Sequence, residues 1–320
     1  MNSHFLWPKP KTQYRKYFFG KNICAADVEA TVEAFFPSTF PILFSSARAG
    51  LSAILQLLKI TRPDIVWCPP YSSHCVLESI ARFGTPSTTD IKHAKVALIY
   101  HQWGFVHTHE YRSDMLVIED AVDTFFLPKT SPFAINGNFV LWSLPKVIAT
   151  RYGGVVFCRN KEDAKGLCII RSARYKMGNP QAVLRMMSDY SSMANSYWHG
   201  NESMNGGLPT FALRQIQEHL THIPVVAEER TNIINTINKY IEFPSYKGRL
   251  PSNIPIKPSP TVDKYWGGQH IFNAGLRSMN LACDFSKNAW AKVAPLPVHQ
   301  NISESVINSL LLEQLSGVFE

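Results

Sequence analysis

Short apolar stretches alternate with segments of helical periodicity between about residues 40 and 160. Apolar strands are predicted at residues 40–44, 65–68, 96–100, 116–118 and 155–158. Helical spacing of apolar residues predicts helices at 47–58 and 76–83. Because parallel strands need a crossover connection between them, this alternation predicts an α/β fold with a mostly parallel sheet and right-handed crossovers.

The pattern changes on both sides of this segment. Residues 24–36 have helical periodicity that ends at Pro37, and residues 161–235 are helix-rich, with a long helix near 225–240. Prolines accumulate beyond about residue 242. We therefore predict a large domain over residues 1–241, including an aromatic N-terminal arm, and a small C-terminal domain over residues 242–320 that ends in an amphipathic helix at 303–315.

Composition favours a globular protein with a substantial core. Of the 320 residues, 45% are apolar and only 18% are charged, which argues against disorder. The longest apolar runs are shorter than the roughly 18–20 residues of a membrane span, and the first 18 residues lack the continuous apolar stretch of a secretory signal. We expect a cytoplasmic protein without a membrane segment.

Cysteine spacing and charge exclude further classes. The six cysteines are scattered without Cys-x-x-Cys spacing, so neither a zinc site nor a disulfide framework is indicated. The net charge of +8 is dispersed and forms no Lys/Arg block, so a nucleic-acid partner is not expected. His107 and His109 form a His-x-His pair with no evident third ligand, so no metal site is predicted.

Chemically suggestive residues follow four of the predicted strands. They are Ser46-Ala47-Arg48, the segment 69–72 with Tyr71, the segment 101–104 with His101 and Trp103, and Glu119-Asp120. In open α/β sheets, ligands bind beyond the carboxyl ends of the strands. The sequence therefore predicts a single site at this edge of the sheet.

Lys146 makes a specific cofactor the leading hypothesis. It follows an apolar strand and precedes the pair Gly153-Gly154. Pyridoxal phosphate (PLP) needs an amine that forms a Schiff base, an anion opposite its pyridine nitrogen and a cradle for its phosphate. Lys146 can supply the amine, Asp120 the anion, and the start of the helix at residue 47 the phosphate site. Ser143 could add a hydroxyl donor.

Several of these residues have alternative interpretations. Asp120 could cap a helix after its strand, and Arg48 could be a surface residue. His101 and Trp103 could be packed loop residues or could contact cofactor or substrate. Tyr71 and His74 are competing candidates for stacking on the cofactor ring.

Five motifs occur in the order seen in the DegT/DnrJ/EryC1/StrS aminotransferases, and the chain resembles this family over nearly its whole length. They are Ser46-Ala-Arg-Ala-Gly-Leu51, Tyr100-His-Gln-Trp-Gly104, Ile118-Glu-Asp-Ala121, Ser143-Leu-Pro-Lys146 with the glycine pair, and Leu296-Pro-Val-His299. The resemblance implies a fold-type-I PLP-dependent transferase. Its large domain would contain a mostly parallel mixed sheet flanked by helices, and its small C-terminal domain would be α+β.

The resemblance also implies roles and partners. Lys146 would bond the cofactor, Asp120 would pair with its pyridine nitrogen, and Ala47, Arg48 and Ser143 would contact its phosphate. A loop that reaches the cofactor of the partner subunit would fall on Asn205-Gly206-Gly207. The implied protein is a homodimer with shared active sites, which aminates a nucleotide-linked keto-sugar with glutamate as donor, for a surface polysaccharide or a related product.

The chain departs from the family pattern at four points. Asp123 stands where a glutamine that donates to the cofactor's phenolic oxygen is common, and an ionised carboxylate cannot donate. Asp123 therefore either points elsewhere or holds a proton. The interval from Ser143 to Lys146 is two residues shorter than usual, glycines replace the tyrosine and arginine of the interface loop, and the small domain is short. The second hypothesis is therefore a catalytically altered PLP-binding member with a regulatory or structural role. A keto-sugar dehydratase is less favoured, since such relatives replace the lysine.

Overall fold

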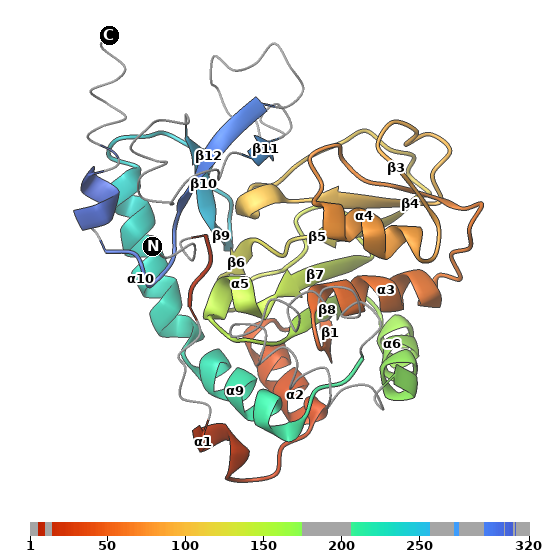
Figure 1. Cartoon of the computed structure of the whole chain (residues 1–320), viewed down its shortest axis with the longest axis horizontal. Helices are drawn as coiled ribbons and strands as arrows, with labels where there is room; N and C mark the ends of the chain where they lie inside the picture. Colours follow the sequence, from red (N-terminus) through yellow and green to blue (C-terminus); the bar gives the residue numbers. More distant parts are fainter. Residues whose placement is uncertain are drawn as a thin grey trace, which may run out of the picture.

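A seven-stranded mixed sheet forms the centre of the computed structural model, which describes residues 6–9, 15–174, 206–256, 272–274, 291–303, 305–309 and 311 (Figure 1). In order across the sheet, the strands are β1 (Phe40–Phe44), β8 (Gly154–Cys158), β7 (Phe139–Ser143), β5 (Leu116–Asp120), β4 (Val96–Tyr100), β2 (Ile65–Trp67) and β3 (Thr85–Ser87). The pairs of β8 with β1 and β7 are antiparallel, and the other pairs are parallel. The prediction of a mostly parallel sheet is confirmed.

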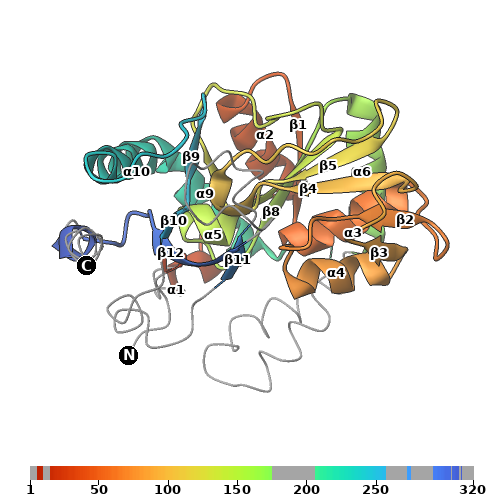
Figure 2. The same cartoon turned by 90° about the horizontal axis from the view of Figure 1, so that it is seen from above.

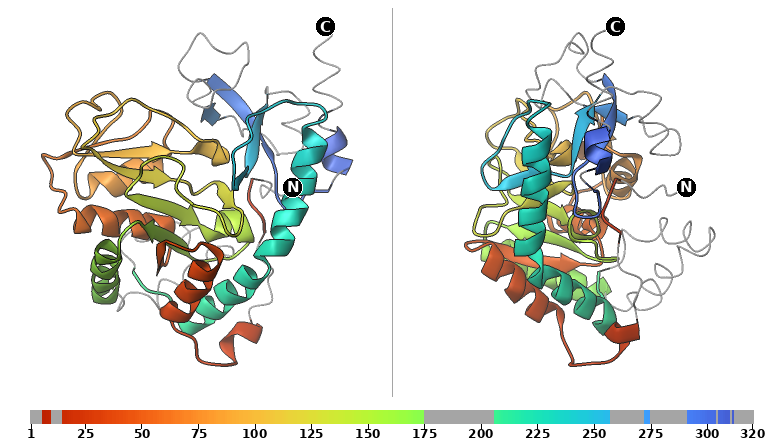
Figure 3. Two further views of the ribbon diagram at one scale, coloured as in Figure 1. Left: turned by 180° about the vertical axis from the view of Figure 1, so that it is seen from behind. Right: turned by 90° about the vertical axis from the view of Figure 1, so that its left-hand side faces the viewer.

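Helices cover both faces of the sheet, as Figures 2 and 3 show from other directions. The helices are α2 (Ala25–Phe35), α3 (Ala47–Leu57), α4 (His74–Ala81), α5 (Leu144–Ile148), α6 (Lys161–Arg174), α9 (Thr210–Thr221) and α10 (Ile223–Ile237), with the short α1 (Arg15–Phe18) before them. Side chains of β7 alternate between the two resulting cores. Val140 and Trp142 face the core of α2, α5 and α9, whereas Phe139 and Leu141 face the core of α3, α4 and α6. This two-residue period is the one expected for a strand buried on both faces.

The predicted elements agree with the structure apart from their ends and the shortest strands. Strand β5 continues two residues beyond the predicted 116–118 to include Glu119 and Asp120, and α4 begins at His74 rather than 76. The three-residue strands β3 and β6 (Thr124–Phe126) were not predicted. They are too short to show a periodicity, and β6 exists because it pairs with β9 (Arg249–Pro251), which lies far away in sequence.

The proline-rich C-terminal region adds a second sheet. Strand β12 (Ala291–Pro297) pairs antiparallel with β10 (Asn253–Ile256) and with β11 (Phe272–Ala274). Apolar residues of β10, β12 and α10 form a third core together with Trp103 and Phe105 from the large sheet's connecting loop. Of the predicted terminal helix, the structure describes residues 305–309 and 311 as helical. None of the helices that the structure describes is long and apolar enough to cross a bilayer.

Gly154 allows β8 to approach the start of α3. A Cβ atom at this position would lie 2.1 Å from the backbone nitrogen of Ala47 and 2.2 Å from the carbonyl carbon of Ser46. The neighbouring Gly153 has a φ of +104° and donates its N–H to the Ser45 carbonyl. Because only glycine leaves room for this backbone contact, the glycine pair fixes the first turn of α3 against the start of β8.

We predict that Gly154→Ala lowers the free energy of unfolding by roughly 1–3 kcal/mol, because the new methyl group displaces backbone atoms that cannot rotate away. Urea denaturation measures the change. Gly166→Ala is the matched control, because the three atoms nearest to its Cβ would all belong to the flexible side chain of Leu57 and none to the backbone. A Gly154→Ala variant as stable as the control would show that the close approach carries no constraint.

Candidate active site

Lys146 lies in the last turn of the five-residue helix α5, directly after β7. Pro145 stands in the first turn, where its missing N–H costs no helical hydrogen bond. The helix ends at Ala149, which has a left-handed φ of 59°. A short helix that begins at a buried strand and stops abruptly places the lysine at the carboxyl edge of the sheet.

The amine of Lys146 forms an ion pair with Asp123. Its Nζ lies 2.8 Å from Asp123 Oδ1, and the Asp123 side chain is completely buried. The other carboxylate oxygen accepts a hydrogen bond from the hydroxyl of Tyr100 and one from the backbone N–H of Trp103 at 3.3 Å. Asp123 therefore faces the lysine, and all of these contacts use it as an acceptor.

The surroundings favour the protonated form of Lys146. Burial acts to lower its pKa, but the charge and hydrogen bond of Asp123 and the charge of Asp120 outweigh burial, so the pKa is raised above its ordinary value. The pKa of Tyr100 is raised well above its usual range by burial and by the charge of Asp123. Tyr100 is therefore a donor to Asp123 over the whole physiological pH range.

Asp120 is the second buried carboxylate at this edge. It is the last residue of β5 and only 2% exposed. Burial raises its pKa to about 7; the charge of Lys146 opposes this increase and the charge of Asp123 adds to it. Asp120 Oδ1 accepts a long hydrogen bond of 3.4 Å from the Val122 N–H. The carboxyl group can thus gain or lose a proton near neutral pH.

The predicted phosphate contacts converge on Gly154. Ser46 caps α3 by accepting a hydrogen bond from the Ala49 N–H at 3.1 Å. Ser143 is paired with Gly154 in the β7–β8 register, and Gly154 in turn packs against the Ala47 backbone. The first N–H groups of a helix have no intrahelical acceptor and attract anions. Ser143 and the start of α3 therefore border one anion-suited corner.

Arg48 lies on the first turn of α3 at this corner. Its side chain is partly buried, and burial lowers its pKa below the ordinary arginine value although the charges of Cys75 and Glu78 act in the opposite direction. Those two residues lie on α4, so the Arg48 side chain lies near α4.

The two candidates for ring stacking occupy different environments. Tyr71 is 8% exposed, and its ring centroid lies 6.2 Å from that of Tyr100, the donor to Asp123. Its hydroxyl contacts Nδ1 of His107 at 2.7 Å and Nε2 of His109 at 3.0 Å. His74 is 84% exposed and pairs with Glu78 on the surface of α4. Tyr71 is thus the better placed of the two.

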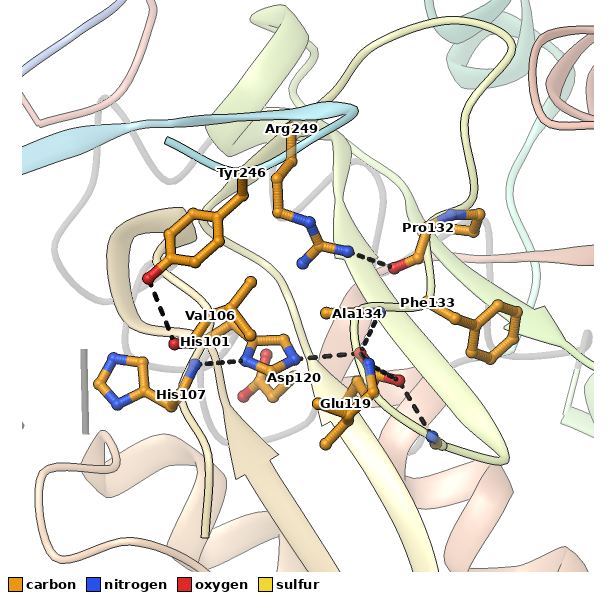
Figure 4. Close-up of polar contacts among 12 residues, drawn as sticks. His101, Val106, His107, Glu119, Asp120, Pro132, Phe133, Ala134, Tyr246 and Arg249 are labelled. Atoms are coloured by element: carbon orange, nitrogen blue, oxygen red, sulfur yellow. Dashed lines mark hydrogen bonds and ion pairs between the residues drawn. The ribbon is translucent and has the colours of Figure 1, made fainter. Parts of the chain in front are cut away.

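His101 is directed toward Glu119 (Figure 4). Its Nε2 lies 3.0 Å from Glu119 Oε2, and its Nδ1 accepts the backbone N–H of His107 at 3.1 Å. This pattern fixes the tautomer that carries the proton on Nε2. Glu119 also accepts backbone N–H groups from Ala134, Ile135 and Gly137. His101 and Glu119 therefore order the loop after β6, and neither ring nitrogen of His101 remains for a ligand.

Trp103 joins the site to the C-terminal sheet. Its backbone N–H donates to Asp123, and its carbonyl accepts the Ser252 N–H at 2.7 Å. Its side chain packs in the core with Ile254 and Leu296. The left-handed φ of 56° allows both backbone contacts at once. The structure thus assigns the Trp103 side chain to packing and its backbone to the site.

Sequence reasoning missed the residues of α9 and α10 that bind the lysine helix. His219 Nδ1 lies 2.6 Å from the Ile148 carbonyl, and Arg230 donates to the Val147 carbonyl at 2.8 Å. Gln215 accepts the Arg151 N–H at 3.1 Å. His219 and Arg230 thus bind the last two carbonyls of α5, and Gln215 binds the backbone just after the helix. No local pattern could have identified them, because they lie 64–83 residues away in sequence.

The predicted partner-reaching loop can be placed only in part. Asn205 lies outside the described residues. Gly206 packs against α6 of its own chain, since a Cβ would lie 2.7 Å from the Arg171 carbonyl oxygen. The assignment of Asn205 to the cofactor remains a prediction.

Comparison with protein families gives a match over residues 28–314 to a family described as "Putative PLP-dependent aminotransferase". The chain belongs to this family. No curated protein matches the sequence.

Solved structures of sugar aminotransferases share the fold. The PLP form of the "Putative sugar aminotransferase Spr1654" from Streptococcus pneumoniae is 13% identical, with a TM-score of 0.66 over 96% of this chain and 97% of that one. PseC from Helicobacter pylori, an aminotransferase of pseudoaminic acid biosynthesis, is 12% identical, with a TM-score of 0.62 over 98% of each chain. A DegT/DnrJ/EryC1/StrS aminotransferase from Brucella abortus is 13% identical, with a TM-score of 0.61 over 92% of this chain and 89% of that one. The fold-type-I architecture and the resemblance to this group are confirmed.

We predict that Asp120→Asn changes how stability depends on pH. Folding raises the pKa of Asp120 from 3.8 to about 7, so between these values the folded protein binds more protons than the unfolded chain. For this group, the free energy of unfolding falls as the pH rises through that window. Between pH 5 and pH 8, the free energy of unfolding measured with urea should therefore fall by roughly 2–3 kcal/mol less in Asp120→Asn than in wild type. The exposed Asp114→Asn control should follow wild type, and parallel wild-type and Asp120→Asn curves would contradict the shift.

Proposed function

We propose that this PLP-dependent aminotransferase transfers an amino group from glutamate to a nucleotide-linked keto-sugar, for a surface polysaccharide or a related product, at the site around Lys146. The observation that carries the proposal is the placement of one amine and two buried carboxylates at adjacent strand ends. Asp123 is 2.8 Å from Lys146 Nζ, and Asp120 and Lys146 perturb each other's pKa. Such mutual perturbation of titratable groups is typical of catalytic sites.

The residues fit the cofactor at both ends. The corner formed by Gly154, Ser143 and the start of α3 suits the phosphate, and Asp120 suits a protonated pyridine nitrogen. Lys146 would bond the cofactor, and Tyr71 is suited to lie over its ring. When bound, PLP supplies an electron sink that makes the Cα proton of an amino acid acidic.

Each side chain has a defined task in this proposal. The Lys146 amine, once neutral, acts as general base and accepts the Cα proton of the amino-acid donor at Nζ. Nζ then acts as general acid and donates this proton to complete the transfer. Asp123 Oδ1 lies 2.8 Å from Nζ and can accept the proton that the ammonium must lose first. Tyr100 keeps the other Asp123 oxygen occupied by donating its hydroxyl. Asp120 supplies negative charge opposite the pyridine nitrogen.

Charge and similarity support an anionic sugar substrate. The net charge of +8 suits a ligand with a diphosphate, and the neighbours with the shared fold are sugar aminotransferases by name. We propose a homodimer with shared active sites, as the resemblance implies.

The second candidate, a PLP-binding protein with a regulatory or structural role, also has a specific observation in its favour. Asp123 stabilises Lys146 as an ammonium, and an ammonium is not a nucleophile. Adding glutamate to the PLP-loaded protein distinguishes the candidates. Conversion of the visible band to the pyridoxamine form supports the aminotransferase, whereas a bound but inert cofactor supports the alternative.

We predict that Lys146→Ala and Lys146→Arg both abolish glutamate turnover and the visible absorbance band of the lysine-bound cofactor. Arginine keeps the positive charge beside Asp123 but cannot form the Schiff base, so it separates the loss of charge from the loss of the nucleophile. The control is Lys161→Ala on α6, away from the site. Retention of the band in Lys146→Arg would refute the assignment.

The visible absorbance band of the lysine-bound cofactor changes with pH and so reports a pKa. We predict that Asp123→Gln lowers this pKa by about one unit or more. The substitution removes a negative charge next to the nitrogen and adds an amide donor for the phenolic oxygen. A spectral pH titration of the PLP-loaded protein measures this pKa, with Asp114→Asn as control. An unchanged titration would place the Asp123 side chain outside the cofactor site.

A further inference from the structure

The N-terminal arm contributes an aromatic side chain to the site. The Nζ atom of Lys146 lies over the ring of Trp7, 4.5 Å from its centroid. An ammonium at this distance from an indole face is attracted by the ring's negative quadrupole. Trp7 belongs to the described segment 6–9, which precedes Lys146 by almost 140 residues, and no sequence motif identified it.

The arm is fixed on the side of the C-terminal sheet. Trp7 packs against the core that includes Ile254 and Leu296, and Pro8 is buried. The Lys9 N–H donates to Asn301 Oδ1 at 3.1 Å. In Figure 1 this segment, in dark red, lies between α10 and α5. Trp7 therefore approaches the lysine from the side of the C-terminal sheet.

The amine is bounded on several sides by named groups. Asp123 contacts it directly, and the charges of Asp120 on β5 and Cys75 on α4 also act on it. Tyr100 on β4 reaches the same carboxylate. Trp7 adds the one aromatic wall recorded among the described residues. The Lys146 side chain is still 31% exposed, so one side of it stays open.

We propose that Trp7 is a positioning residue for Lys146. Its ring closes the side of the amine that faces the C-terminal sheet, keeps the ammonium against Asp123, and directs an incoming carbonyl compound to the remaining open side. Nζ lies over the Trp7 ring, so any group that becomes covalently bonded to Nζ must lie next to this ring. The inference deepens the proposed function, on which its catalytic meaning rests, because the same lysine must accept the cofactor's aldehyde.

Reductive methylation tests the proposal without the cofactor. Full-length, cofactor-free wild-type, Trp7→Leu and Trp7→Phe proteins are treated with formaldehyde and cyanoborohydride between pH 6 and pH 10. Peptide mass spectrometry measures the methylation rate of Lys146, with the exposed Lys161 as internal control. Removing the indole ring opens one side of the Lys146 amine and removes an attraction that favours its ammonium form. In Trp7→Leu, Lys146 should therefore be methylated about fivefold faster near pH 7.5, and the pH midpoint of its methylation rate should be lower. Trp7→Phe retains a ring and should stay close to wild type.

The outcomes separate this inference from the proposed function. Equal Lys146 rates and midpoints in wild type and Trp7→Leu would overturn the role of Trp7, as would a Trp7→Phe variant that behaves like Trp7→Leu. A parallel increase at Lys161 would indicate general loosening of the fold and would likewise overturn it. Failure of PLP to give a visible band in wild type would refute the proposed function, whereas the methylation result stands by itself.

Discussion

The buried carboxylate of Asp123 is the constraint on which the site depends. A completely buried carboxylate is costly unless charged or polar partners satisfy it. Its partners come from separate segments: Lys146 from α5, the Tyr100 hydroxyl from β4 and the Trp103 N–H from the following turn. Satisfying one carboxylate therefore aligns the ends of β4, β5 and β7. The Trp103 carbonyl extends the alignment to Ser252, so the C-terminal sheet is positioned by the same turn.

The lysine helix is fixed from its other side by α9 and α10. A helix of five residues has almost no stability of its own, because nearly all of its carbonyls lack intrahelical partners. His219 and Arg230 bind two of these carbonyls, and burial lowers the pKa of Arg230 to about 9. Burying this arginine completely is costly, and the cost is offset by the Val147 carbonyl and by the ring of Phe125, whose centroid lies 4.9 Å from Arg230 Cζ. The position of Lys146 therefore results from long-range contacts on both sides, not from local helix propensity.

The sequence predicted the features that leave a local pattern, and it missed those that depend on long-range contacts. Apart from the three-residue β3, the strands of the large sheet were predictable, as were the helices α2 and α3, because buried apolar faces leave a period in the sequence. Lys146, Asp120 and Asp123 were identifiable because strand ends and motif order place them. The position of His101 after its strand was predictable, but the direction of its side chain was not. The ring is held against Glu119 by a tertiary contact, which leaves no local pattern in the sequence. Trp7, His219 and Arg230 reach the site from distant segments, and nothing in their local sequence marks them.

The charges at this edge favour binding of a cationic ring nitrogen. Asp120 is buried next to a second carboxylate, and burial is the main reason that its pKa is raised to about 7. A positive charge placed against Asp120 would lower that pKa again, because an opposite charge favours ionisation. By linkage, the ionised carboxylate must strengthen binding of the cation by the same free energy. A ligand that placed a protonated nitrogen against Asp120 would therefore recover the penalty that burial imposes on this carboxylate, and it would bind more tightly than a neutral ring of the same shape.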